Sequence, residues 1–150
     1  MTAAFEYGIA DLPRLGREIA GALRVGDVIG LSGELGAGKT ALARAILAAL
    51  GLEGEAPSPS FAIVQPYDAP PLRLPVWHVD LYRLDRAEET LELALDEARS
   101  DAALLVEWPE HWGRYAPADM LRLQIEGAGE RRRLTAQLPP AWEPRWPFPR

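Results

Sequence analysis

The sequence contains no cysteine, no asparagine and no long apolar run. Without cysteine the chain has no disulfide, no thiolate metal ligand and no cysteine nucleophile, which fits an intracellular protein. A membrane-spanning helix needs about 18 consecutive apolar residues, and no stretch comes near that length. The N-terminus also lacks the basic and apolar stretches of a signal peptide. These absences favour a cytoplasmic location without membrane contact.

Lysine is almost absent as well, because only one of the 16 basic residues, Lys39, is a lysine. The preference for arginine extends over the whole chain and indicates coding bias. Lys39 lies inside a glycine-rich segment, where a compact ammonium fits within a loop wrapped around a phosphate better than a planar guanidinium does. The net charge is −6, and an acidic chain gains little from counterion release on nucleic acid. We therefore expect any RNA to be held mainly by a partner.

Residues 33–40 match the pattern Gly-x-x-x-x-Gly-Lys-Ser/Thr and are called the glycine-rich loop below. Glycines let the backbone approach phosphates, and the N–H groups at the start of the following helix favour negative charge. In this pattern Lys39 neutralises phosphate oxygens, and the Thr40 hydroxyl is a ligand of Mg²⁺. The motif therefore predicts Mg-ATP binding at Gly33, Glu34, Leu35, Gly36, Ala37, Gly38, Lys39, Thr40 and Ala41.

Helical spacing of apolar residues predicts helices over residues 11–23, 38–50 and 86–99, the last with Leu91 and Leu95 on one side. Apolar runs or alternation predict strands over residues 28–31, 61–64, 76–79, 102–106, 121–125 and 134–138, the last two as an antiparallel pair. Prolines and glycine predict loops over residues 53–59 and 68–75.

The alternation of strands and helices predicts a single-domain α/β fold with an at least partly parallel sheet. With the glycine-rich loop, we expect a P-loop NTPase fold with a mostly parallel sheet and a C-terminal antiparallel strand pair. We expect this ATPase domain to cover residues 1–138. Residues 139–150 hold five prolines and two tryptophans, and we expect them to form a non-helical tail that lies on the surface or stays loose.

Two of the expected strands end in a carboxylate, Asp80 and Glu107. Ligands of parallel sheets bind at the carboxyl ends of the strands, so both side chains should lie near Thr40. One carboxylate can hold Mg²⁺, directly or through water, while the other orients the attacking water.

Other candidate residues are less specific. His78 alternates with Asp80 along the strand, and we interpret it as a structural histidine. Trp108 fits either core packing or stacking on a partner or base, and His111 and Trp112 indicate no reaction by themselves. The basic run of residues 131–133 fits a solvated strand edge slightly better than a phosphate contact.

These pieces together resemble the TsaE family (formerly YjeE), the ATPase of bacterial tRNA threonylcarbamoyladenosine synthesis. The resemblance rests on the glycine-rich loop, Ser58-Pro59-Ser60-Phe61, His78-Val79-Asp80-Leu81-Tyr82-Arg83-Leu84 and Leu105-Val106-Glu107-Trp108-Pro109. Their order and spacing extend over about residues 11–133, and the last two pieces are far more specific than the loop.

The resemblance implies a weak ATPase that acts with the TsaD and TsaB subunits, which transfer threonylcarbamoyl to tRNA. It implies that Thr40 and Glu107 hold the metal and that Asp80 is needed for hydrolysis. It also implies that residues 58–61, with Ser58 and Ser60, act as a nucleotide-sensing switch, although the family usually has threonine in place of Ser60. A family arginine near the nucleotide corresponds here to Arg133 or Arg132. The family offers no counterpart of the tail.

Three other readings compete with this one. A small-molecule kinase could use the same loop, but it would need an acceptor pocket and usually an arginine-bearing lid. A switch GTPase is excluded, because its Asn-Lys-x-Asp segment needs asparagine and a second lysine. A nucleotide-dependent scaffold would differ from the ATPase only in whether turnover matters.

Overall fold

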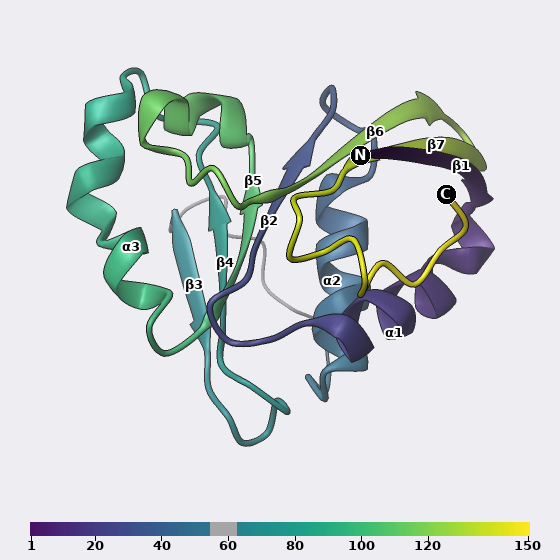
Figure 1. Ribbon diagram of the computed structural model, residues 1–150, viewed down its shortest axis with the longest axis horizontal. Helices are drawn as coiled ribbons and strands as arrows, with labels where there is room; N and C mark the ends of the chain where they lie inside the picture. The colour runs from purple at the N-terminus through teal and green to yellow at the C-terminus, as the bar shows by residue number, and fades with distance from the viewer. Residues whose placement is uncertain (55–62) are drawn as a thin grey trace.

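The computed structural model describes residues 1–54 and 63–150. Its sheet has the strand order β1-β7-β6-β2-β5-β4-β3, with helices on both faces (Figure 1). The strands are β1 (Thr2–Gly8), β2 (Val28–Ser32), β3 (Val64–Tyr67), β4 (Val76–Asp80), β5 (Ala103–Glu107), β6 (Leu121–Ala128) and β7 (Arg131–Gln137). The α-helices are α1 (Leu12–Ala22), α2 (Lys39–Ala49) and α3 (Leu95–Ala98), and the 3₁₀ helices are η1 (Ile9–Asp11), η2 (Ala87–Leu93) and η3 (Pro109–Tyr115).

The sheet is mixed rather than mostly parallel, which corrects the expectation from the sequence. The four central strands, β6, β2, β5 and β4, run parallel to one another. The pairs β1–β7, β6–β7 and β3–β4 are antiparallel. The expected C-terminal antiparallel pair is therefore present, and β1 extends it. Because the central strands are parallel, the carboxyl ends of β2, β4 and β5 meet at one edge, where a ligand site is expected.

Two apolar clusters pack on the two faces of the sheet. The larger one joins α1, α2 and β1 to the sheet, and includes Leu15, Ile19 and Ile46, all with no exposed surface. The smaller one lies under η2, α3 and η3 and includes Val79, Leu104 and Trp112. Central strands that are buried on both faces read as continuous apolar runs, as in β2 and β5. This explains why their positions could be predicted.

The segment 86–99 is not the continuous helix that its pattern predicts. It consists of η2 and the short α3, separated at Ala94, whose φ of 55° lies in the left-handed region. Leu91 is 60% exposed whereas Leu95 is 3% exposed, so the two do not share a buried side. The segment packs against the equally irregular η3, and this tertiary contact overrides the local helical preference.

Residues 61 and 62 of the strand expected over residues 61–64 lie outside the described residues; within the described part, β3 begins at Val64 and includes Pro66. Proline lacks a backbone N–H, but β3 is an edge strand, where that loss is tolerated. Within the described ranges, no helix is long and apolar enough to cross a membrane.

The C-terminal segment, residues 139–150, is packed against the protein rather than loose. It forms turns without a regular helix, and Trp142, Trp146 and Phe148 are all buried in the larger apolar cluster. The Arg145 guanidinium also forms a two-pronged ion pair with Asp27, with N–O distances of 2.9 Å. The segment therefore contributes to the same core as the rest of the chain.

Candidate functional site

The glycine-rich loop connects the carboxyl end of β2 to the start of α2. Gly38 has a φ of 111°, in the region that strongly favours glycine, and directly precedes the first residue of α2. A Cβ at Gly33 would lie 2.6 Å from the backbone oxygen of Ile125, so only glycine fits there. The loop therefore has the backbone geometry that lets it turn tightly and aim the N–H groups at the N-terminus of α2 outward.

Lys39 lies under this loop with 5% of its surface exposed. Its Nζ donates hydrogen bonds to the backbone oxygens of Gly33 (2.7 Å) and Glu34 (2.9 Å). The same Nζ lies 4.6 Å from the ring centroid of Trp108. Burial lowers the pKa of Lys39, while the nearby carboxylates, Glu107 foremost, act in the opposite direction. The ammonium is thus fixed at the loop, where it can neutralise a bound anion.

Thr40 and Glu107 meet at the edge of the sheet, as the sequence predicts. The Thr40 hydroxyl donates to Glu107 Oε1 at 2.7 Å. The second oxygen, Oε2, accepts a hydrogen bond from His78 Nε2 at 2.6 Å. Glu107 is 2% exposed and His78 is fully buried. The Glu107 carboxylate is therefore held on both oxygens, one by α2 and the other by β4.

Asp80 lies beside Glu107, because the two residues are register partners on β4 and β5. Among the described residues its carboxylate accepts one hydrogen bond, from the backbone N–H of Tyr82 at 3.0 Å. Asp80 is therefore less constrained than Glu107, which is held on both oxygens. Burial raises the pKa of Asp80, and the Glu107 carboxylate adds to this rise, while the Tyr82 N–H, His78 and Lys39 oppose it. A half-buried carboxylate with a raised pKa is suited to accepting a proton.

An aromatic group covers one side of the site. Trp108, which follows Glu107, has a φ of 58° and a ψ of 52°, a left-handed conformation that costs a bulky residue about 1–3 kcal/mol. The sharp turn places its ring 4.9 Å from that of Tyr82 and 5.6 Å from that of His111. Trp108 thus packs within the protein over Lys39. Of the two interpretations that the sequence allows for Trp108, packing within the protein is the one seen here.

The β6–β7 hairpin places Arg132, rather than Arg133, at the glycine-rich loop. Arg132 donates through one terminal nitrogen to the backbone oxygens of Gly36, at 3.0 Å, and Ala37. Arg133 is the next residue on β7 and therefore points to the other side of the sheet. It is exposed and lies opposite Glu6 and Glu126 on the neighbouring strands. The hairpin therefore contacts the loop through Arg132, and which of the two arginines lies near a nucleotide stays a prediction.

Two hollows lie beside the loop. One, of about 250 Å³, contains the polar groups of Lys39, Thr40, Asp80 and Glu107, with Tyr82 and Trp108 on its rim. The other, of about 510 Å³, lies between residues 33–37 of the loop and residues 124–128 of β6. The larger one has the size of a small-molecule pocket. Together they can accept a polar, phosphate-bearing group next to a bulkier one.

The residues at this edge fit Mg²⁺, although the described part of the chain has no group of three or more acidic, histidine or cysteine side chains placed to bind a metal together. Magnesium usually keeps several waters and takes only one or two protein ligands. Two neighbouring octahedral ligands at about 2.1 Å from the metal lie roughly 2.9 Å apart. The Thr40 and Glu107 oxygens, 2.7 Å apart, are already close to that separation.

Several contacts of the site could not be predicted from the sequence. The bond between His78 and Glu107, the position of Trp108 over Lys39 and the contact of Arg132 with the loop all come from tertiary packing. The alternation of His78 with Asp80 was the available signal for the first. Ser58 and Ser60, the expected switch residues, lie outside the described residues, and their role stays a prediction.

The comparisons with known proteins agree on one family. Residues 8–135 match the family model described as "Threonylcarbamoyl adenosine biosynthesis protein TsaE". The chain is 44% identical over 119 residues to the tRNA threonylcarbamoyladenosine biosynthesis protein TsaE of Streptomyces coelicolor, which covers 76% of this chain and 78% of the relative. It is 40% identical over 116 residues to the protein of the same name from Mycobacterium tuberculosis H37Rv, with 69% of each chain covered.

The fold has a solved counterpart. The crystal structure of YdiB from Bacillus subtilis superposes with a TM-score of 0.76 and 25% sequence identity, and covers 97% of this chain and 93% of YdiB. The structural likeness thus extends over nearly the entire chain, including β1 and most of the C-terminal segment. The family model, the relatives and the fold lead to the same conclusion: this chain belongs to the TsaE family of tRNA threonylcarbamoyladenosine biosynthesis proteins.

Proposed function

We propose that this chain has a P-loop NTPase fold, binds Mg-ATP at the glycine-rich loop and hydrolyses it slowly. The observation that carries this proposal is the convergence of Thr40 and Glu107, with oxygens 2.7 Å apart, beside the buried ammonium of Lys39. A glycine-rich turn without ligand function needs neither a buried lysine nor a fixed carboxylate. A bound nucleoside triphosphate requires both, a lysine to neutralise phosphate charge and a carboxylate to hold the metal, at one edge of the sheet.

The roles of the residues follow from their positions. Lys39 can move its hydrogen bonds from the loop oxygens to phosphate oxygens. Thr40 and Glu107 would hold Mg²⁺, which neutralises charge on the phosphates when bound. The backbone N–H groups at the start of α2 bind the phosphates, and the 510 Å³ hollow receives the nucleoside.

Asp80 is the group that acts on water in this proposal. Its carboxylate lies next to Glu107 in register and is held by one hydrogen bond, to the backbone N–H of Tyr82. The remaining oxygen can orient a water molecule toward the terminal phosphate and accept its proton. The raised pKa of Asp80 favours this transfer.

Hydrolysis by the isolated chain should be slow. Fast phosphate transfer usually adds an arginine beside the terminal phosphate, which accelerates the reaction roughly 10³–10⁵-fold. Arg132 of the β6–β7 hairpin already donates its hydrogen bonds to backbone oxygens of the glycine-rich loop. We propose that the TsaD–TsaB complex completes the site, holds the tRNA and couples hydrolysis to threonylcarbamoyl transfer.

The direct test is phosphate release by the purified chain, measured alone and with added TsaD–TsaB complex. We expect slow release alone and an increase of at least about tenfold with the complex, well within what one supplied arginine can contribute. Rapid turnover without the complex would contradict the need for partners. Efficient phosphorylation of a small acceptor, tested on a panel of nucleosides and coenzyme precursors, would indicate a kinase instead.

A further inference from the structure

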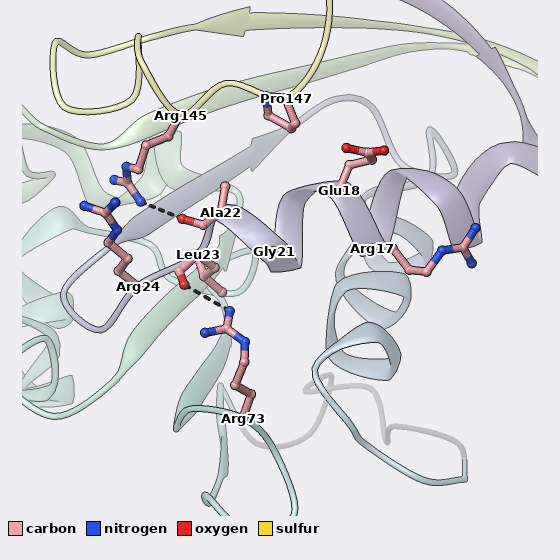
Figure 2. A pocket seen from close by; sticks show the side chains of 9 residues that line it. All are labelled: Arg17, Glu18, Gly21, Ala22, Leu23, Arg24, Arg73, Arg145 and Pro147. Carbon is pink, nitrogen blue, oxygen red and sulfur yellow. Dashed lines mark hydrogen bonds between the residues drawn. The ribbon is translucent and has the colours of Figure 1, made fainter.

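A third hollow lies at the end of the sheet opposite the glycine-rich loop. It has a volume of about 650 Å³ and surrounds the C-terminal turn of α1 (Figure 2). The residues that line it are Arg17, Glu18, Gly21, Ala22, Leu23, Arg24, Arg73, Arg145 and Pro147. β2 begins just after this region and ends at the loop, so its five residues, about 16 Å long, separate the two sites.

Two of the four arginines have a structural role here. Arg73 donates to the backbone oxygens of Ala20 and Leu23, and Arg145 donates to that of Ala22 and to Asp27. These contacts satisfy the free carbonyl groups at the end of α1, as basic side chains often do. The charge of Arg145 is thereby balanced by Asp27, whereas Arg73 has no ion-pair partner among residues 1–54 and 63–150.

The other two arginines are not explained by the fold. Arg17 and Arg24 are exposed, and neither side chain has a hydrogen-bond or ion-pair partner among residues 1–54 and 63–150. Figure 2 shows Arg24 beside Arg145 at the end of α1, with Arg17 farther along the helix. Although the chain has a net charge of −6, four arginines and one glutamate line this hollow, so its local charge is positive.

Gly21 provides an independent observation. Helix α1 contains two glycines, and a Cβ at Gly16 would lie 2.4 Å from the backbone oxygen of Ala45, so the packing against α2 requires glycine there. A Cβ at Gly21 would meet nothing within 4 Å. Gly21 is the second-last residue of α1. Glycine in a helix costs stability relative to alanine, and no contact among residues 1–54 and 63–150 requires glycine at this position. Its place in the floor of the hollow indicates that something else approaches the helix closely.

We propose that this hollow, the arginine pocket, is a docking site for an acidic segment of a partner protein. Guanidinium groups bind carboxylates through paired hydrogen bonds, and arginine is enriched in protein interfaces. Glu18 on the rim and the helix carbonyl groups beneath repel a ligand that is negative throughout, such as a nucleic acid backbone. They tolerate a peptide whose carboxylates are spaced by neutral residues, and Gly21 leaves room for its backbone.

The test uses the full chain and a fluorescein-labelled twelve-residue peptide of alternating glutamate and alanine, with a glutamine–alanine peptide as the neutral reference. Binding is measured by fluorescence anisotropy at low ionic strength, because salt weakens such contacts. We expect the acidic peptide to bind and Arg24→Glu to weaken it at least tenfold. Arg44→Glu, an equal charge change at an exposed position on α2, should leave the affinity within twofold of wild type.

Gly21→Ala sharpens the test, because its two expected effects have opposite signs. The variant should melt at a higher temperature than wild type yet bind the acidic peptide at least tenfold more weakly. Failure of the acidic peptide to bind, or equal affinity for Arg24→Glu and Arg44→Glu, would overturn the proposal. The proposal would also be overturned, in favour of a phosphate ligand, by a labelled single-stranded RNA twelve-mer that binds wild type more tightly than the peptide does and binds Arg24→Glu only weakly.

Nucleotide binding is followed in parallel to separate this proposal from the proposed function. Arg24→Glu and Gly21→Ala should keep the wild-type melting shift with Mg-ATP, because the arginine pocket and the loop share no lining residue. Loss of that shift in both variants would overturn the independence of the two sites.

Discussion

The ends of β4 and β5 carry the same sequence signal but give their carboxylates different surroundings. Glu107 is 2% exposed and both of its oxygens are hydrogen bonded, to Thr40 and His78. Asp80, its register partner, is only half-buried and, among the described residues, accepts one hydrogen bond, from the Tyr82 backbone. The difference arises because β5 lies between two parallel strands, whereas the next neighbour of β4 is the short edge strand β3.

This comparison suggests a division of labour. A carboxylate held on both oxygens keeps its position and is suited to a metal ligand, whereas a looser carboxylate with a raised pKa is suited to moving a proton. Sequence patterns place both groups at the same edge of the sheet, but only the tertiary contacts distinguish their surroundings.

The largest effect is expected from Glu107→Gln. The amide keeps the shape of the side chain and can still accept from Thr40, but it removes the negative charge that would hold Mg²⁺. We expect hydrolysis to fall to background, with magnesium no longer strengthening ATP binding. Calorimetric titration of ATP with and without Mg²⁺ checks this.

Glu110→Gln is the matched control for Glu107→Gln. Glu110 is exposed and accepts a hydrogen bond from Ser32 at 3.2 Å, close to the same edge of the sheet. It should retain most of the wild-type rate. If Glu107→Gln hydrolysed ATP as fast as Glu110→Gln, Glu107 would have no place at the metal.

Asp80→Asn should separate catalysis from binding. Loss of a proton acceptor lowers the rate of such reactions by about 10²–10⁴-fold, while Mg-ATP affinity should stay within a few-fold of wild type. Phosphate release and calorimetric titration on one preparation check both parts. A variant with a wild-type rate would remove Asp80 from the reaction.

The same substitution should stabilise the protein at neutral pH without ligand. Burial raises the pKa of Asp80 above its ordinary value of 3.8, so the folded chain binds this proton more tightly than the unfolded chain does. Ionisation of Asp80 therefore destabilises the fold, and its cost sets in as pH rises through the folded pKa. Asp80→Asn should melt above wild type at pH 7, and the difference should disappear below about pH 3.8. A lower melting temperature at pH 7 would contradict the assigned direction.

A smaller effect is expected from His78, which acts by positioning Glu107. His78→Ala leaves a buried carboxylate oxygen without a partner, which costs about 1–3 kcal/mol, and should weaken the apparent magnesium affinity about 10–100-fold. His78→Gln can place an amide N–H near the same oxygen and should recover much of that affinity. If both variants lost stability but neither changed the magnesium dependence of hydrolysis, the role of His78 would be structural alone.

The parts of the fold that the sequence predicts are those in which local pattern and tertiary environment agree. The apolar runs of β2, β4 and β5 and the amphipathic pattern of α1 lead directly to buried elements. The irregular segment 86–99 was wrongly expected to be one helix, because its contact with η3 outweighs helical spacing. Strand β1 was not predicted, because it depends on pairing with β7, far away in the sequence.

The candidate site follows the same rule. The glycine-rich loop and the two strand-end carboxylates could be predicted, since their chemistry depends on residue type and strand direction. The choice of Arg132 over Arg133 could not, because it depends on the hairpin register, where a shift of one residue moves a side chain to the other face. The burial of Trp142, Trp146 and Phe148 also depends on a surface that other segments build.

The most direct test of the central claim is the melting shift that Mg-ATP produces in wild type and in Lys39→Ala. A ligand at 100 times its dissociation constant stabilises a protein by about 2.7 kcal/mol, which corresponds to roughly 5–10 °C for a chain of this size. We predict such a shift for wild type and none for Lys39→Ala, with both proteins folded without ligand. An equal shift in the two proteins would contradict phosphate binding at the glycine-rich loop.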